Sequence, residues 1–165
     1  LSLVKMDKAA ADLNVSTINV NELLEQILKR LQPIADKQKV ELVLESFRPV
    51  TAEVDEVKIT LAITNLVENA IKYTQQGGTI QIKVCPYEIY TEIQILDNGC
   101  GIHEEETTEI FKRFYRSREV EHIEGSGIGL YLSNLILEKE KGYMVVKSVY
   151  GEGSCFSVFL QNCKN

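Results

Sequence analysis

The sequence predicts an α/β fold in which helices lie on one face of a mixed β-sheet. Apolar residues recur every three or four positions in three long stretches, as they do along a helix that packs on a core. In several shorter stretches they alternate with polar residues or run together, which is typical of strands. Two pairs of these strands, one mid-chain and one at the end, are separated by short turns and indicate hairpins. Elements mixed in this order are expected to pack as two layers.

The helix and strand patterns of the first half begin at a capping pair. Asn19 and Glu22 are three residues apart, as at a helix start, and a predicted helix follows. Residues 40–44 alternate as a strand, and residues 50–54 form a short extended piece. Residues 1–12 look like the frayed end of a preceding helix and are a candidate linker. The apolar face of the predicted helix is made by Val20, Leu23, Leu24, Ile27, Leu28 and Leu31.

The second half contains both hairpins. A long helix is predicted for residues 55–73 and ends at a Gln-Gln-Gly-Gly turn. The remaining pattern consists of a hairpin at 79–84 and 89–96, an irregular polar stretch at 103–124, a glycine-rich turn at 125–129 that opens a helix ending near 141–142, and closing strands at 143–149 and 155–160.

Size and charge limit what the chain does. Its 165 residues, 44% of them hydrophobic, are enough for one domain with its own core. The formal net charge of -6 argues against a domain that grips nucleic acid through phosphate contacts. No apolar run approaches the roughly 20 residues that cross a bilayer, so we expect a soluble domain. Because the chain begins at Leu1, we expect it to be a piece of a longer protein.

The cysteines and histidines give no sign of a zinc site. The cysteines show no C-x-x-C pairing and no clustering with the histidines, so free thiols in a reducing compartment are predicted. The residues concerned are Cys85, Cys100, Cys155, Cys163, His103 and His122.

A polar stripe runs along the predicted helix 55–73, which is otherwise too apolar to have one face in water. Asn65, Glu68, Asn69 and Lys72 recur at i, i+3, i+4 and i+7 and therefore lie on one side of it. Polar groups beside a core need partners. Either solvent meets them, or a magnesium-nucleotide does, because amide and carboxylate oxygens suit a hard cation and a lysine suits phosphate.

Two glycine motifs follow. The segment Asp97-Asn98-Gly99-Cys100-Gly101-Ile102 comes directly after a strand, so Asp97 either faces a ligand or caps the following backbone. The segment Gly125-Ser126-Gly127-Ile128-Gly129-Leu130 opens a helix and is either a phosphate cradle or a structural hinge. Its spacing fits neither a dinucleotide fingerprint nor a Walker loop.

Aromatic and cationic residues lie between the two glycine motifs. This segment, Phe111-Lys112-Arg113-Phe114-Tyr115-Arg116, is either part of a mobile lid or a charged surface helix with two core phenylalanines.

Taken together and in this order, four motifs resemble the N, G1, F and G2 boxes of sensor histidine kinases. They are Asn65-x-x-Glu68-Asn69-Ala70-x-Lys72-Tyr73, Asp97-x-Gly99-x-Gly101, Phe111-x-x-Phe114 and Gly125-x-Gly127-x-Gly129-Leu130. The wider superfamily includes gyrase-type and chaperone-type ATPases and mismatch-repair proteins, but the F box and the Asn-Ala-x-Lys-Tyr ending favour the kinases.

The resemblance implies a Bergerat-type fold: a two-layer α/β sandwich with a mixed, mostly antiparallel sheet, about three helices and a flexible ATP lid at about 103–124. Residues 1–12 would be the remnant of a dimerisation helix or linker, and residues 13–165 the ATP-binding catalytic domain. The implied ATP-binding residues are Asn65, Asn69, Lys72, Tyr73, Asp97, Gly99, Gly101, Ile102, Phe114, Gly125, Ser126, Gly127, Ile128, Gly129 and Leu130.

The resemblance also implies chemistry and partners. Asn69 would hold Mg²⁺ with help from Asn65 and Glu68, and Glu68, Lys72 and Arg116 would act in transfer of the γ-phosphoryl group of ATP. The acceptor would be a histidine in the parent's dimerisation domain, and a response regulator would receive the group next. The parent is expected to be a homodimer anchored in the cell membrane with this domain in the cytoplasm, and the piece alone is expected to be monomeric.

The sequence departs from the family at the histidines and one cysteine. Neither His103 nor His122 lies in the family's phosphoacceptor motif, so both are expected to be solvated loop residues, and the acceptor is absent. Cys155 stands where the family commonly has a threonine near the adenine. Two alternatives stay open: a degenerate module that binds nucleotide for regulation, and an ATPase that uses Glu68 to activate water.

Overall fold

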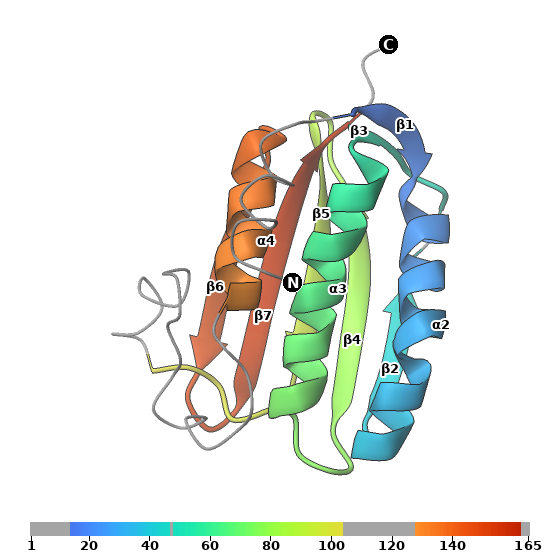
Figure 1. The fold of residues 1–165 in the computed structure, drawn as a ribbon. Coiled ribbons are helices and arrows are strands. Elements are labelled where there is room, and N and C mark those ends of the chain that lie inside the picture. The colour runs from blue at the N-terminus through green and yellow to red at the C-terminus, as the bar shows by residue number, and fades with distance from the viewer. Residues whose placement is uncertain (1–13, 47, 104–127, 163–165) are drawn as a thin grey trace.

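The computed structural model describes residues 14–46, 48–103 and 128–162, with the side chains of residues 128 and 129 outside the description (Figure 1). Within these ranges the elements, labelled as in Figure 1, are β1 (Ser16–Asn19), α2 (Val20–Gln38), β2 (Glu41–Glu45), β3 (Thr51–Val54), α3 (Glu56–Tyr73), β4 (Thr79–Pro86), β5 (Tyr90–Asp97), α4 (Ile128–Lys139), β6 (Tyr143–Val149) and β7 (Gly153–Gln161).

The main sheet has five strands in the order β2-β4-β5-β7-β6. Only β2 and β4 are parallel, and the three other neighbouring pairs are antiparallel. Figure 1 shows α2, α3 and α4 side by side on one face of this sheet. The predicted two-layer sandwich, its mixed sheet and both hairpins are therefore confirmed.

Local sequence signals explain how the helices start. The side chain of Asn19 accepts a hydrogen bond from the Glu22 N–H at 3.0 Å, which caps α2 as predicted. Asp55 caps α3 in the same way, with the Lys58 N–H at 3.1 Å from its Oδ1. A left-handed residue, Lys39 with φ of 59°, ends α2.

One strand was not predicted. Residues Ser16–Asn19 form β1, which pairs antiparallel with β3 in a separate two-stranded ribbon. The predicted extended piece at 50–54 therefore does not join the main sheet. A four-residue strand in which only Ile18 is buried carries too little alternation to be recognised from sequence.

The core lies between the sheet and the helices. Strand residues alternate between the two faces, so the isoleucines of β5 point toward the helices and Asp97, at the end of the same strand, lies on that face too. The buried apolar strand residues on this face are Ile80, Ile82, Val84, Ile93, Ile95, Met144, Val158 and Leu160.

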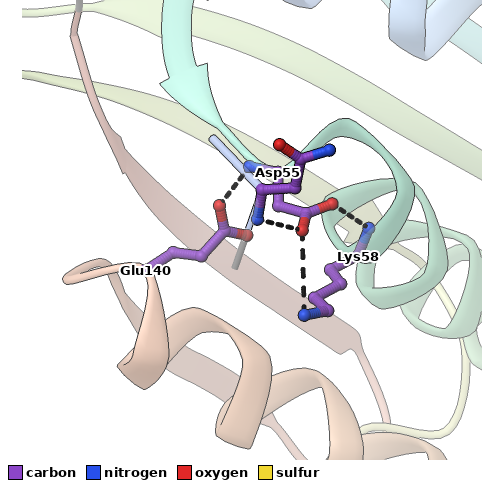
Figure 2. Close-up of polar contacts among 4 residues, drawn as sticks. Asp55, Lys58 and Glu140 are labelled. Atoms are coloured by element: carbon purple, nitrogen blue, oxygen red, sulfur yellow. Dashed lines mark hydrogen bonds and ion pairs between the residues drawn. The ribbon is translucent and has the colours of Figure 1, made fainter. Parts of the chain in front are cut away.

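A polar junction ties the end of α4 to the start of α3 (Figure 2). The carboxylate of Glu140, which follows α4, accepts a hydrogen bond from the Asp55 N–H at 2.5 Å. The Asp55 carboxylate accepts from the Asn14 N–H at 2.8 Å and lies 3.7 Å from the Lys58 ammonium. Asp55 and Glu140 are only 4% and 8% exposed. This junction lies at the N-terminal end of α3, whereas Tyr73 is the last residue of the same helix.

In the part of the chain that the structure describes, no helix has the length and apolar character needed to cross a membrane.

Candidate nucleotide site

The parts of the predicted site meet at one end of the sandwich. The C-terminal end of α3, the loop that follows β5, the first turn of α4 and the β6–β7 turn all lie at the lower end of Figure 1. These segments are far apart in the sequence. The fold therefore brings the N-box helix and the Asp97 turn to a common edge.

The polar stripe of α3 is divided between half-buried and exposed side chains. Asn65 and Asn69 are half-buried, whereas Glu68 and Lys72 are exposed. The amide groups of Asn65 and Asn69 make no hydrogen bond to any residue that the structure describes. Their oxygens are consequently open to solvent or to a ligand, which leaves both predicted interpretations of the stripe compatible with the fold.

Asp97 is the last residue of β5 and is held by the backbone around it. Its Oδ1 accepts a hydrogen bond from the Gly99 N–H at 2.9 Å. Burial raises the pKa of Asp97 above its ordinary value, and the N–H groups of Gly99 and Ser154 oppose that rise. The interpretation of Asp97 as a cap of the following turn is therefore confirmed, and this cap also fixes the carboxylate on the helix-facing side of the sheet.

The glycines of the Asp97 turn allow close backbone approach. A Cβ at Gly99 would lie 2.5 Å from the Tyr73 carbonyl oxygen, so only glycine lets the turn rest on the end of α3. Gly101 has a φ of +73°, and a Cβ there would collide with the Val149 carbonyl. The turn is thus packed between α3 and β6 and brings the nearby Tyr73 and Ile102, both half-buried, to the same edge.

Several predicted site residues lie outside the described part of the chain. They are Phe114, Arg116, Gly125, Ser126 and Gly127, together with the side chain of Ile128. The helix expected after the glycine-rich turn is confirmed, since α4 begins at Ile128. Leu130, in its first turn, is half-buried and packs against the core.

Two expectations about the edge of the site need correction. Cys155 pairs across the sheet with Leu96, and its Sγ lies 3.8 Å from the Ser157 Oγ, so this free thiol is on the face away from Asp97. Ser154 is the residue paired with Asp97. A count of alternate positions back from buried Val158 would have shown this. His103 is not a solvated loop residue: it is half-buried, and its ring stacks on that of Tyr150 with centroids 3.8 Å apart. His122 lies outside the described residues.

A comparison with known protein families identifies the family to which the chain belongs. The model of the histidine kinase-, DNA gyrase B-, and HSP90-like ATPase family matches residues 54–163, more than half of the chain. The chain belongs to this ATPase family. Its matched region contains α3 with the polar stripe, the Asp97 turn and the whole of β4 to β7.

Three curated relatives of this ATPase domain are sensor kinases. It is 33% identical to the sensor protein kinase PmrB of Pseudomonas aeruginosa over 97% of this chain and 34% of that protein. It is 32% identical to the sensor histidine kinase RppB of Synechocystis over 97% of this chain and 36% of that protein. It is 33% identical to the adaptive-response sensory kinase SasA of Rippkaea orientalis over 86% of this chain and 37% of that protein. The chain thus spans about a third of these relatives.

Solved structures show the same Bergerat fold. The mycobacterial sensor histidine kinase MprB superposes with a TM-score of 0.81 at 23% identity, covering 90% of this chain and 98% of that one. Full-length ShkA, crystallised in complex with AMPPNP, gives a TM-score of 0.84 at 21% identity over 98% of this chain and 34% of that one. At these identities the likeness shows the fold alone.

Proposed function

We propose that this ATPase domain binds Mg-ATP at the edge formed by α3 and the Asp97 turn, as the catalytic domain of a sensor histidine kinase. The observation that carries the proposal is Asp97, a carboxylate fixed by the Gly99 N–H beside the end of α3. A fixed acceptor on the helix-facing side suits the amino group of adenine, which donates a hydrogen bond. Tyr73 and Ile102, both half-buried at the same edge, would pack on the base.

The donor set on α3 fits magnesium. Asn69 and Asn65 offer amide oxygens without partners among the described residues, and the exposed Glu68 offers a carboxylate. Oxygen ligands of this kind are those that Mg²⁺ takes, usually with several waters and the phosphates of the nucleotide. When bound, the ion would neutralise phosphate charge, and Lys72, on the exposed side of the same helix, would add a second positive charge.

The remaining steps of the proposal rest mainly on residues outside the described ranges, together with the first residues of α4. Gly125, Ser126, Gly127, Ile128, Gly129 and Leu130 would bring backbone N–H groups to the phosphates. Phe114 would anchor a lid at about 103–124, and Arg116 would stabilise the transferring γ-phosphoryl group. Both assignments follow the family motifs.

The proposed reaction needs a second domain. In the parent protein, the γ-phosphoryl group would pass to a histidine of a dimerisation domain that precedes residue 13, and then to a response regulator. The relatives named above support this order, since they are sensor kinases, and the histidine kinase ThkA was crystallised in complex with the response regulator TrrA. We further propose a cytoplasmic position for this domain in a homodimeric, membrane-anchored parent, with the isolated chain monomeric.

Calorimetric titration with a non-hydrolysable ATP analogue, with and without Mg²⁺, tests the nucleotide site. We expect magnesium-dependent binding that Asp97→Asn reduces at least tenfold and Asn69→Ala reduces mainly by removing the magnesium dependence. Asp36→Asn, on the exposed face of α2, serves as a matched control and is expected to bind as the wild type does. A folded wild-type domain that binds no nucleotide would contradict the proposal.

Phosphoryl transfer is tested on the chain extended to its own acceptor helix. With γ-labelled ATP, we expect acid-labile label on a histidine, and none after Asn69→Ala. Steady release of phosphate by the isolated domain, lost in Glu68→Ala, would instead favour hydrolysis of ATP as the reaction.

A further inference from the structure

The Ser148 hydroxyl joins three segments at the edge of the nucleotide site. Ser148 lies on β6, faces the helices and is half-buried. Its Oγ accepts a hydrogen bond from the Ile102 N–H at 2.7 Å. It also lies 2.9 Å from the Gly153 carbonyl oxygen and 2.9 Å from the Ser154 Oγ. One arrangement satisfies all three contacts: Ser148 donates to Gly153 and accepts from Ile102 and Ser154.

These bonds continue a row that starts at Asp97. Asp97 pairs with Ser154 across β5 and β7, and Ser154 pairs with Ser148 across β7 and β6. Residues paired in this way point to the same face of a sheet and lie about 5 Å apart. Ser148 therefore holds both ends of the Asp97–Ile102 turn. It holds the Asp97 end indirectly through Ser154, and it holds the Ile102 end directly through the Ile102 N–H.

Backbone contacts between the same two segments support this arrangement. The Gly151 N–H donates to the Cys100 carbonyl at 2.7 Å, and Gly101 rests against the Val149 carbonyl. Beside these contacts and the stacking of His103 on Tyr150, the Ile102 N–H attaches the outer part of the turn to the sheet through the Ser148 hydroxyl. Removal of the Ser148 hydroxyl would leave that N–H without its partner.

We propose that Ser148 is a positioning residue of the nucleotide site, which sets affinity and base preference by holding the Asp97–Ile102 turn. The inference rests on the proposed function. Ser148 does not itself contact the base, since its hydroxyl is fully used by Ile102, Gly153 and Ser154. It acts through Ile102, which packs on the base, and through Ser154, which is paired with Asp97 across β5 and β7. A turn that is free to shift would lose both contacts together.

The test compares Ser148→Ala with Ser148→Thr, which keeps the hydroxyl and suits a strand. Ser157→Ala is the matched control, because Ser157 is also a strand serine but is buried on the opposite face, beside Cys155. Each variant is titrated with Mg-ATP and Mg-GTP analogues that resist hydrolysis. Amide hydrogen exchange at Ile102, measured by NMR without nucleotide, reports on the turn itself.

We expect Ser148→Ala to weaken binding of the ATP analogue about tenfold. The reason is that Ile102, which packs on the base, loses the hydrogen bond that holds its N–H. Its preference for the ATP analogue over the GTP analogue should narrow, and exchange at Ile102 should become faster. Ser148→Thr should restore all three properties, and Ser157→Ala should leave them within twofold of the wild type.

Two results would overturn the inference. One is a folded Ser148→Ala variant with wild-type affinity and base preference. The other is a threonine variant that regains stability but not affinity, since that would make the residue merely structural. Failure of the wild-type domain to bind any nucleotide would count against the proposed function instead, and faster exchange at Ile102 in Ser148→Ala would still show that the hydroxyl holds the turn.

Discussion

The junction between Glu140 and Asp55 predicts that the domain loses stability as the pH rises toward neutrality. Burial raises the pKa of Glu140 from its ordinary value of 4.5 to about 7. The Asp55 carboxylate adds to the rise, whereas the Asp55 N–H and the Lys58 ammonium oppose it. The second carboxylate oxygen of Glu140 is buried and has no hydrogen-bond partner among the described residues, which also favours the protonated form.

The sign follows from proton binding in the two states. Between pH 4.5 and about 7, the unfolded chain has ionised Glu140 while the folded domain keeps it protonated, so unfolding releases a proton. Stability is therefore fully present below pH 4.5 and falls as the pH rises through 7. The unscreened pKa change corresponds to about 3 kcal/mol. Because Glu140 directly follows the end of α4 and keeps a small exposed fraction of 8%, screening reduces the expected loss to about 1–2 kcal/mol.

Glu140→Gln is the variant that tests this reasoning. Glutamine keeps an acceptor for the Asp55 N–H and stays neutral, so the variant should match the wild type at pH 5 and exceed it by about 1–2 kcal/mol at pH 8. Urea unfolding followed by circular dichroism at four pH values gives the free energies. Glu138→Gln, at an exposed position of α4 two residues before Glu140, should show the same dependence of unfolding free energy on pH as the wild type. If the unfolding free energies of the wild type and Glu140→Gln changed with pH in parallel, Glu140 would not be the group responsible.

Three further predictions concern the turn and a helix cap. Gly99→Ala should weaken binding of an ATP analogue at least tenfold, because its Cβ would meet the Tyr73 carbonyl. Gly77 is the control, since it has a φ of +89° but open space around it. Gly77→Ala should lower the free energy of unfolding without changing affinity in the same titration. Affinity for the ATP analogue should fall as the pH is lowered toward the raised pKa of Asp97, because protonation removes the charge from the carboxylate that accepts the hydrogen bond of the base; a constant affinity in calorimetry would oppose this. Asn19→Ala should lower the free energy of unfolding by about 1 kcal/mol in urea and leave nucleotide affinity unchanged.

Periodicity explains why the fold could be predicted. The start of α2 at Asn19 and the extent of α3 follow from local spacing, and the helix period alone places Asn65 and Asn69 on one side of α3. The β-hairpins are also local. Each of these features depends on residues within one or two elements, and sequence spacing carries that information.

The features that the sequence did not reveal depend on distant pairing. Ser148 is 46 residues from Ile102, and Glu140 is 85 residues from Asp55, so no local pattern connects either pair. The face on which Cys155 lies depends on the register of β7 against β5, which a motif alignment does not give. Sequence could name the residues of the Asp97 turn, but not the strands that hold it.

The position of β7 in the sheet has a consequence for synthesis of the protein. This final strand lies between β5 and β6, so β6 has no sheet neighbour until the last residues of the domain are available. On a ribosome the chain would emerge with β5 as an open sheet edge, which is the kind of surface that pairs with other chains. The Asp97 turn would gain its Ser148 and Ser154 contacts only after release of the C-terminal strand. Nascent chains stopped before residue 153 should therefore recruit chaperones, and the domain should mature only after translation has passed its final strand.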